Sequence, residues 1–424
     1  MADEFFDSWP VRFSLILLGY GSVLLPGYLL IRWVEKYEKV NSHHGGESGN
    51  RSLWRLFLRR FAVGRPEIIG STLVTHEKPA QPKKTLSFVE HATQLFGFFV
   101  GIQITLVSMG FFQERIMTQK YDRIINQGEE IEQDHFTDAQ FLVLANRVVA
   151  LAVAVSYLWW DWKNQPPHAP PLYMYAFCSI SNTLSSYCQY EALKFVSFPT
   201  QTFCKASKLI PTMIMGRILR KERFSRGECL TATLLVIGAA LFFYSTISDS
   251  GKGSLTEQKA MFWAAVSGSI LMIGYLAFDA FTPNWQKKLF EIKPKISRIQ
   301  MMMGVNVFSA ILCLVSLLEQ NSLFPSINFL LTHNRITFDV FLLSFCGALS
   351  QFFIYAIVER FGPSVLALIM TIRQFSSILL SSAYFKHSLN AIGLLGLFIA
   401  FSALCFNIYY NYRKKTIKPS KTSK

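Results

Sequence analysis

The sequence predicts an all-α polytopic membrane protein, with ten helices arranged as two inverted sets of five and one extra transmembrane helix at the N-terminus. Hydrophobic residues make up 51% of the 424 residues and include 38 Phe, which a soluble chain of this length would not gather into many long runs. Eleven separate runs are long enough to cross a bilayer, which takes about 20 residues. The basic residues behind the net charge of +15 fall mainly between these runs.

The first predicted element is a span over Phe13–Trp33. It is long, follows several acidic residues and lacks a small-x-small cleavage site, so we expect an uncleaved helix and not a signal peptide. A polar, basic segment then runs to residue 94. Within it, 51–60 is either an amphipathic helix lying on an anionic membrane face or a solvated linker. Residues 1–94 are therefore predicted to form a transmembrane helix followed by a basic cytosolic segment.

Ten further spans make up a predicted transporter domain, 95–411, with halves 95–247 and 259–410 and a basic cytosolic tail, 412–424. The spans are Leu95–Phe112, Phe141–Trp160, Leu172–Leu193, Phe195–Leu219, Glu228–Ile247, Lys259–Phe281, Ile299–Leu318, Phe338–Ile357, Phe361–Phe385 and Ala391–Tyr410. Because five is an odd number, the second half enters the membrane from the opposite side. This is the pattern of an inverted repeat, which is common in secondary transporters.

Loop charges predict the orientation. With the C-terminus in the cytosol, the cytosolic segments hold 28 Lys and Arg and the opposite loops hold 9. Cytosolic loops carry such an excess of basic residues. Eleven spans then place the N-terminus on the non-cytosolic side.

The span Phe195–Leu219 carries two lysines near its middle, Lys205 and Lys208. Residues three apart share a face of a helix. One cation at mid-membrane costs roughly 2.5–3.5 kcal/mol on insertion scales, so two on one face require a compensating anion or a water-filled cavity. They either bind an anionic substrate or pair with acids on neighbouring helices.

Arg373 is the corresponding cation of the second half. Pro199 precedes the two lysines in the fourth span of the first half, and Pro363 precedes Arg373 in the fourth span of the second. The guanidinium offers a planar fork of donors suited to phosphate or sulfate. The structural alternative is an ion pair with Glu359 or Asp279 on other helices.

Four further polar residues in the spans are candidate substrate contacts, each with a structural alternative. Arg147 either binds substrate or snorkels to a membrane edge. Tyr275 shares a helix face with Asp279 and either hydrogen-bonds a ribose or anchors a helix. Asn306 and Gln351 either contact substrate or join helices. Together these residues favour a secondary transporter with a cationic cavity at the midplane for a small, multiply charged anion.

Signatures of an enzyme are weak. The sequence GKGS at 251–254 lacks the spacing of a phosphate-binding loop, and HExxH and GxSxG do not occur. The seven cysteines have no paired spacing, so neither a metal site nor a disulfide framework is indicated. We therefore expect no enzymatic activity and no cofactor, and membrane lipid, not nucleic acid, explains the basic balance.

Six motifs resemble the nucleotide-sugar transporter family, of the solute carrier 35 type. They are GIQITLVSMGFFQERIMT (101–118), FLVLANRVVAL (141–151), SNTLSSYCQYEALKFVSFPTQTFCKASKLIPTMIMG (181–216), YLAFDAFTPNWQKKLF (275–290), QMMMGVNVFSA (300–310) and LIMTIRQ (368–374). Within the family they are similar to the members that carry adenosine 3′-phosphate 5′-phosphosulfate (PAPS). The resemblance implies the ten-helix fold of drug/metabolite transporters, here with one added N-terminal helix.

The resemblance also implies a function. It implies a Golgi membrane protein with a lumenal N-terminus that imports PAPS from the cytosol for lumenal sulfotransferases, in exchange for an adenine nucleotide such as 3′,5′-ADP or AMP. The lysines of the family's fourth span match Lys205 and Lys208, and its TxRQ-type cation matches Arg373, which implies that these three contact the anion. A carrier of a different nucleotide sugar, and a scaffold or receptor without transport, are the alternatives. A homodimer is left open.

Overall fold

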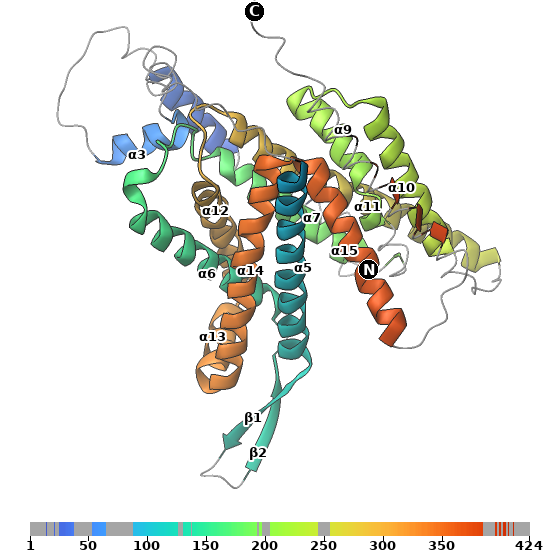
Figure 1. Cartoon of the computed structure of the whole chain (residues 1–424). Coiled ribbons are helices and arrows are strands. Elements are labelled where there is room, and N and C mark those ends of the chain that lie inside the picture. The colour runs from blue at the N-terminus through green and yellow to red at the C-terminus, as the bar shows by residue number, and fades with distance from the viewer. Residues whose placement is uncertain are drawn as a thin grey trace, which may run out of the picture.

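The computed structural model describes residues 14, 21, 25–37, 53–64, 88–125, 130–136, 138–192, 195–196, 204–244 and 255–384, with 395–396, 398–399, 402–403, 406 and 410 (Figure 1). Its helices are α3 (Leu53–Ala62), α5 (Phe88–Thr118), α6 (Ala139–Trp160), α7 (Met174–Ala192), α9 (Leu209–Arg220), α10 (Arg226–Tyr244), α11 (Leu255–Glu291), α12 (Arg298–Glu319), α13 (Leu323–Thr332), α14 (Asn334–Arg360) and α15 (Pro363–Tyr384). Five stretches of the described helices are long and apolar enough to cross a membrane: Ala92–Met117, Ala139–Trp160, Val266–Glu291, Arg298–Glu319 and Arg335–Arg360. The chain is therefore a helical, multi-span membrane protein.

Local hydrogen bonds explain where several helices begin and end. Asp138 caps α6 by accepting from the amide of Phe141 at 3.0 Å. Ser297 and Gln300 form a reciprocal capping box at the start of α12. At the other end of α9, Lys221 takes a left-handed conformation with φ 53° and donates its N–H to Gly216 O. Each cap satisfies a backbone group that a helix end leaves without a partner.

Most of the predicted spans coincide with described helices, but two of these helices are much longer than predicted. Helix α5 runs from Phe88 to Thr118, whereas the prediction was Leu95–Phe112. The span predicted over Lys259–Phe281 is a helix that runs from Leu255 to Glu291 and includes Pro283. Its last turns carry polar residues, which hydropathy alone treats as loop. They stay helical because neighbouring helices bind them. Asn284, for example, is fully buried and donates to Thr212 O of α9 at 2.9 Å.

The two outermost predicted spans lie largely outside the described residues. Of Phe13–Trp33, the C-terminal part belongs to a helix over 25–37. Of Ala391–Tyr410, single helical residues and pairs between 395 and 410 are described. The short stretch 51–60, which the sequence left open, falls mostly within α3, so the helical alternative is confirmed.

A hairpin between α5 and α6 was not predicted. Strands β1 (Lys120–Ile125) and β2 (Glu130–His135) pair antiparallel and extend beyond the ends of α5 and α13 (Figure 1). The register places Lys120 opposite His135 and Ile125 opposite Glu130. At its base, Tyr121 is buried with its ring 5.9 Å from those of Phe329 and His333. Contacts distant in sequence therefore stabilise a charged segment that lacks the usual strand pattern.

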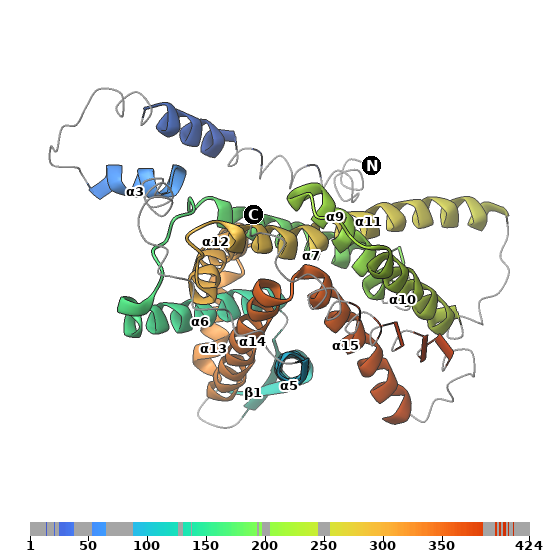
Figure 2. The same cartoon turned by 45° about the horizontal axis from the view of Figure 1, so that its top comes forward.

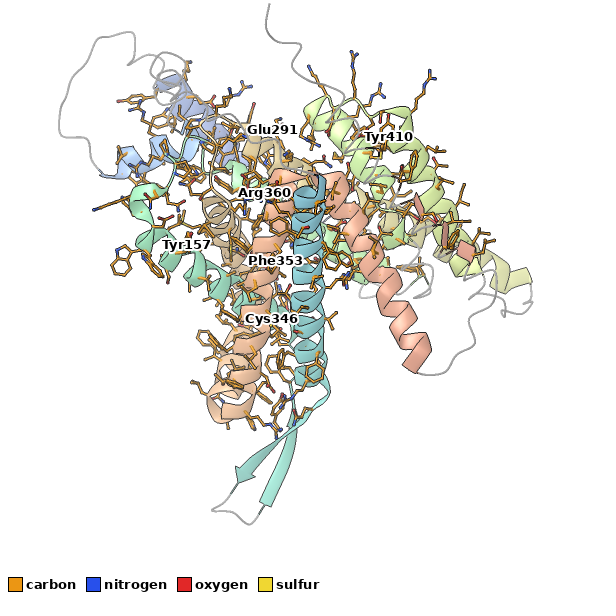
Figure 3. The ribbon with its side chains drawn as sticks, viewed as in Figure 1. Tyr157, Glu291, Cys346, Phe353, Arg360 and Tyr410 are labelled. Atoms are coloured by element: carbon orange, nitrogen blue, oxygen red, sulfur yellow. The ribbon has the colours of Figure 1, made fainter. Side chains whose placement is uncertain are left out.

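Four pairs of helices make the most extensive contacts in the described part of the chain. These contacts join α7 to α11, α5 to α14, α6 to α12 and α6 to α14. Helices α9, α10 and α15 lie on one side of the molecule, and α6, α12 and α13 lie on the other (Figure 1, Figure 2). Phe353 on α14 faces Gly101 on α5, where a Cβ would lie 2.8 Å from the Phe353 ring (Figure 3). The absence of a side chain at Gly101 thus permits the close approach of α5 and α14.

Candidate functional site

The helix predicted over Phe195–Leu219 is interrupted at Ser207 and Lys208. Residues 204–206 are helical, 207–208 form a turn, and α9 begins at Leu209. The amide of Ile210 donates to Ser207 O at 3.4 Å, as in a turn of three residues. The prediction of one continuous helix is therefore wrong.

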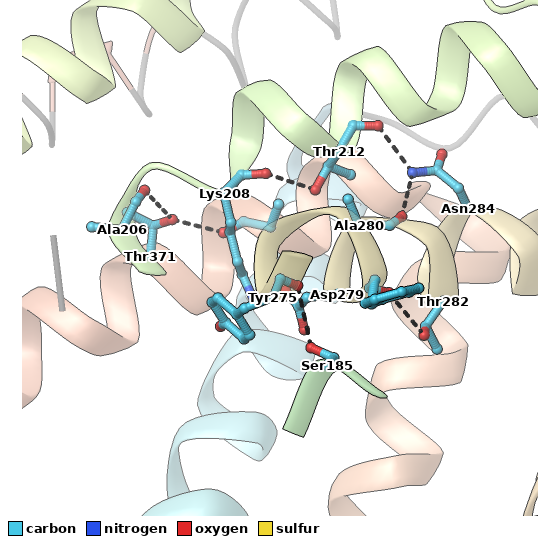
Figure 4. Close-up of polar contacts among 12 residues, drawn as sticks. Ser185, Ala206, Lys208, Thr212, Tyr275, Asp279, Ala280, Thr282, Asn284 and Thr371 are labelled. Carbon is cyan, nitrogen blue, oxygen red and sulfur yellow. Dashed lines mark hydrogen bonds and ion pairs between the residues drawn. The ribbon is translucent and has the colours of Figure 1, made fainter. Parts of the chain in front are cut away.

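A side chain from the second half of the protein stabilises this break. Thr371 on α15 donates its hydroxyl to Ala206 O at 3.1 Å and to Ala367 O of its own helix at 2.9 Å (Figure 4). Thr371 and Ala206 are both fully buried. A carbonyl at a helix break needs such a partner when water is excluded. The break and the contact with α15 thus occur together, and they place Lys208 at the N-cap of α9.

The three predicted cations are brought together at this break. Lys205 lies within electrostatic range of Arg373, Lys208 and Asp279. The Nζ of Lys208 is 3.5 Å from Asp279 Oδ2 of α11, with the two side chains 19% and 33% exposed (Figure 4). In this structure Lys208 therefore pairs with an acid on another helix, which is the structural alternative for this residue. Arg373 makes no ion pair with either predicted acid. Asp279 pairs with Lys208 instead, and Glu359 pairs with Arg298.

Arg373 has unused capacity to bind an anion. Its Nε is buried without a hydrogen-bond partner among the described residues. Tyr275, one turn before Asp279 on α11, is 6% exposed and within electrostatic range of both Arg373 and Asp279. A buried, unsatisfied donor on a charged group is costly, so a ligand that accepts from it gains stability.

A cavity of about 280 Å³ adjoins this cluster. Its charged lining residues among those described are Arg147, Lys208 and Asp279, whereas Lys205 and Arg373 do not line it. Polar side chains from several helices also line the cavity: Asn146, Asn182, Thr212, Thr282, Gln286, Ser309, Ser350, Gln351 and Tyr355. The volume is just below the roughly 300 Å³ at which ligand pockets begin. A nucleotide therefore requires the cavity to widen.

Arg147 belongs to the cavity and not to the membrane edge. It lines the same space as Lys208, and its Nε is buried without a hydrogen-bond partner among the described residues. This position favours the substrate-binding alternative over snorkelling. Arg147 supplies a cation from α6 to the cavity that Lys208 also lines.

The two amides lie together, and they differ in what they can do. Asn306 is fully buried and donates from Nδ2 to Gln351 Oε1 at 2.7 Å and to Met302 O at 2.8 Å. It therefore joins α12 to α14, as the structural alternative proposed. Gln351 lines the cavity. With its Oε1 occupied, the Nε2 amide is the group left to donate to a ligand.

Several site residues were missed from the sequence. Asp279 was considered only as a ribose contact or as a partner of Arg373, and its pairing with Lys208 was not assigned. Thr212 follows Lys208 by four residues and donates to its carbonyl at 2.8 Å. Asn146 adjoins Arg147 in the chain. For Thr212 the spacing of four residues places a polar side chain on the face of Lys208, and this signal could have been used. Asn146 gives no such signal, because adjacent helical residues do not share a face.

The close approach of α6 and α14 positions Asn146 and Arg147. A Cβ on Gly347 would lie 2.5 Å from the Asn146 carboxamide. We therefore expect Gly347→Ala to destabilise the protein by about 1–3 kcal/mol through overpacking. Gly110→Ala on α5 is the matched control, because nothing lies within 4 Å of a Cβ there. Thermal unfolding in detergent should show a lower midpoint for the first variant and an equal or higher midpoint for the second. Equal midpoints for both would contradict the contact.

Comparison with known proteins is consistent with this arrangement. A family model described as the UAA transporter family matches residues 94–411. The chain is 46% identical over 419 residues to adenosine 3′-phospho 5′-phosphosulfate transporter 1 of Caenorhabditis elegans, covering 98% of this chain and 95% of that protein. It is 38% identical over 410 residues to the protein of the same name from Homo sapiens, covering 96% and 88%. It is 35% identical over 324 residues to UDP-galactose/UDP-glucose transporter 5 of Arabidopsis thaliana, covering 75% and 87%.

Proposed function

Because this chain belongs to the UAA transporter family, we propose that it is a membrane transporter of PAPS. The observation that carries the proposal is its likeness to two PAPS transporters over nearly the whole length of both chains, at 46% and 38% identity. The site adds a physical reason. Four cations, Arg147, Lys205, Lys208 and Arg373, lie in or beside one interior cavity, where a multiply charged anion is the ligand that they suit.

The charge of PAPS fits this set of cations. It carries a 3′-phosphate and a 5′-phosphosulfate, together on the order of four negative charges at neutral pH. Movement through a bilayer requires that this charge be neutralised along the path. We propose that Arg373 binds one anionic end with its two-pronged donor fork, and that Lys205 and Lys208 act as compact charges at the other. Arg147 and the Gln351 amide are proposed contacts on the opposite wall, and Tyr275 orients Arg373.

Asp279 supplies the anion for Lys208 when no substrate is bound. The 3.5 Å pair between them contributes to the narrowness of the cavity. We infer that a phosphate or sulfate of the substrate displaces the Asp279 carboxylate from Lys208. The break at Ser207 and Lys208 also places the N-terminal end of α9, with its positive dipole end, beside Lys208, where it favours an anion.

The cations that have no acidic partner explain why the carrier would exchange one nucleotide for another. Among the described residues, Lys205 and Arg373 have no ion-pair partner, so reorientation of the empty carrier would move unneutralised charge. Binding of either PAPS or an adenine nucleotide relieves this repulsion. We therefore propose antiport of cytosolic PAPS against 3′,5′-ADP or AMP in the Golgi membrane, which supplies lumenal sulfotransferases. The lumenal N-terminus, cytosolic C-terminus and homodimer stay predictions.

The helix contacts support the proposed inverted repeat of five plus five. An inverted repeat pairs each helix of the first half with a counterpart in the second: α5 with α11, α6 with α12, α7 with α14, α9 with α15, and α10 with the last predicted span. A contact between two helices should then recur between their two counterparts. The α5–α14 contact is matched by α11–α7, and the α6–α14 contact by α12–α7, whereas the α11–α9 contact has no comparable counterpart between α5 and α15 among the described residues. The α6–α12 and α9–α15 contacts match themselves. Carriers of this kind place substrate sites at the repeat interface. Lys205 and Lys208 come from the helical residues 204–206 and the turn before α9, and Arg373 comes from α15.

The second candidate function is transport of a nucleoside-diphosphate sugar. It is favoured by the 35% identity to a UDP-galactose/UDP-glucose transporter, which spans 75% of this chain. The two functions differ in charge, because a diphosphate sugar lacks the 3′-phosphate. Uptake of radiolabelled PAPS, UDP-galactose and UDP-glucose into proteoliposomes loaded with 3′,5′-ADP, AMP or UMP separates them. We expect PAPS uptake driven by the adenine nucleotides, and preferential uptake of either UDP-sugar would overturn the proposal.

The 3′-phosphate should contribute strongly to recognition. We expect adenosine 5′-phosphosulfate, which lacks it, to compete with PAPS about tenfold or more weakly, because one charge-assisted hydrogen bond contributes about 1.5–3 kcal/mol. Half-maximal inhibition of PAPS uptake measures the difference, with 3′,5′-ADP as the matched competitor that retains the 3′-phosphate. Equal inhibition by nucleotides with and without this phosphate would show that the 3′ position is not read.

A further inference from the structure

A second cavity, of about 620 Å³, lies away from the cation cluster. Its lining comes from the end of α3, the end of α6, the segment that joins α6 to α7, and the start of α12. The proposed transport site uses none of these residues. The cavity therefore requires an explanation of its own.

One side of this cavity is apolar and open to the surroundings. Val155, Trp159 and Trp162 line it and are 47%, 82% and 75% exposed. Val155 and Trp159 belong to the last turns of α6, which is long and apolar enough to cross a membrane, and Trp162 follows just after its end. Tryptophan gathers at the boundary between acyl chains and headgroups, where its ring is partly in each. The cavity thus opens at the level of lipid headgroups.

The other side of the cavity carries groups that bind a charged headgroup. Arg60 is exposed at its edge and makes no ion pair among the described residues. Gln165 also lines the cavity. Its Nε2 donates to Asp161 Oδ2 at 2.9 Å, but its Oε1 is buried without a hydrogen-bond partner among the described residues. A cation beside an unsatisfied acceptor suits a ligand that presents an anion and a donor together.

Helix α3, which carries Arg60, has the character of a helix that lies on a membrane surface. Trp54 and Phe57 are 65% and 48% exposed on this helix, with stacked rings 5.7 Å apart. Arg59 and Arg60 occupy its last turn. Exposed aromatic residues on a short helix that ends in basic residues are typical of a helix lying in the interface of an anionic membrane.

Backbone contacts fix α3 to the rest of the protein. The amides of Leu172 and Tyr173 donate to Arg60 O and Phe61 O, each at 3.4 Å. Gln300 of α12 donates from Nε2 to Pro166 O at 2.7 Å and holds the segment that forms the cavity floor. These hydrogen bonds hold α3, which carries Arg60, and the segment after α6, which carries Gln165, in fixed positions at the cavity.

We propose that this cavity binds one anionic glycerophospholipid from the leaflet on which α3 lies. Its phosphate contacts Arg60, a hydroxyl or ammonium donor of its headgroup reaches Gln165 Oε1, and its acyl chains lie along Val155, Trp159 and Trp162. Phosphatidylserine and phosphatidylinositol carry such donors. Phosphatidylcholine has no net negative charge and no headgroup donor, so it should bind poorly.

Thermal unfolding of the purified, delipidated full-length chain tests the proposal. Short-chain phosphatidylserine, phosphatidylcholine of the same chain length and inorganic phosphate are added separately. A ligand that binds the native state raises the midpoint of unfolding, by an amount that grows with the logarithm of its concentration above the Kd. We expect phosphatidylserine to raise the midpoint by a few degrees, and the other two to raise it little. An equal effect of inorganic phosphate would mean that the site takes a free anion, and an equal effect of phosphatidylcholine would mean that it does not read the headgroup. Either result overturns the proposal.

Matched variants locate the binding. Arg60→Gln and Trp159→Ala should lose most of the phosphatidylserine effect. Lys163→Gln and Trp160→Ala should keep it, because both side chains are exposed but do not line the cavity. Native mass spectrometry of bound phosphatidylserine gives a second measure that does not depend on unfolding. If all four variants respond as the parent protein does, lipid binds elsewhere and the assignment is wrong.

Discussion

Arg373→Ala is expected to reduce PAPS exchange by about a hundredfold or more. The guanidinium has a buried Nε with no partner among the described residues, beside Tyr275 and Lys205. If it forms a fork of two charge-assisted bonds with the substrate, its removal forfeits about 1.5–3 kcal/mol for each. Arg373→Lys should restore only a small part of the rate, because an ammonium is a point charge and cannot reproduce two parallel bonds.

The measurement is counterflow of labelled PAPS in proteoliposomes that contain equal amounts of folded protein, judged by gel filtration and thermal unfolding. Arg217→Ala is the matched control, because Arg217 is exposed near the end of α9 and does not line the cavity. It should exchange at close to the parental rate. Parental exchange by a folded Arg373→Ala protein would remove Arg373 from the mechanism.

Lys208→Ala is expected to cause a loss of similar size, and a second substitution should partly reverse it. The single variant leaves the Asp279 carboxylate in the cavity without its partner at 3.5 Å, where it repels an anionic substrate. The double variant Lys208→Ala with Asp279→Asn removes this repulsion while still lacking the lysine. Asp279→Asn alone frees Lys208 for the substrate, so it should lower the apparent KM for PAPS by a few-fold. This reduction is modest because both side chains are partly exposed and their interaction is screened.

A double-mutant cycle on apparent KM and maximal rate separates these effects. The displaced-carboxylate mechanism predicts that the double variant is faster than Lys208→Ala at low PAPS concentration. If Asp279→Asn instead weakens PAPS binding, or if the double variant is slower than Lys208→Ala, then Asp279 contacts the substrate or supports the fold. It would not be a competitor for Lys208 in that case.

The sequence predicted most of the helical spans, and it singled out the cations that the structure brings together. Both carry strong signals, because a membrane span must be long and apolar and a charge within it is conspicuous. Lys205, Lys208 and Arg373 are recognisable at once, since uncompensated charge in an apolar span is costly. The interruption at Ser207 and Lys208 has no comparable local signal. Neither residue breaks a helix, and the carbonyl of Ala206 receives its partner from Thr371, which is 165 residues away.

Other features also depend on contacts that are distant in sequence. The pairing of Asp279 with Lys208 was missed because several acids could have served and nothing in the spacing selects one. The β1–β2 hairpin is stabilised at its base by the packing of Tyr121 on α13, and α13 itself is a short helix between two spans. For Arg147 the sequence left substrate binding and snorkelling open, because only its position in the span was known. Its side chain lines the cavity between helices.

In the proposed mechanism, different cations of the site bind the two anionic ends of PAPS. The most direct test compares competition by PAPS and by adenosine 5′-phosphosulfate for the parent protein, Arg373→Gln and Lys208→Gln. In the parent, loss of the 3′-phosphate should weaken competition about tenfold or more. One of the two variants lacks the residue that binds the 3′-phosphate, and in that variant PAPS and adenosine 5′-phosphosulfate should compete almost equally. In the other variant, adenosine 5′-phosphosulfate should still compete more weakly than PAPS. A difference that is the same in the parent and in both variants would contradict the claim.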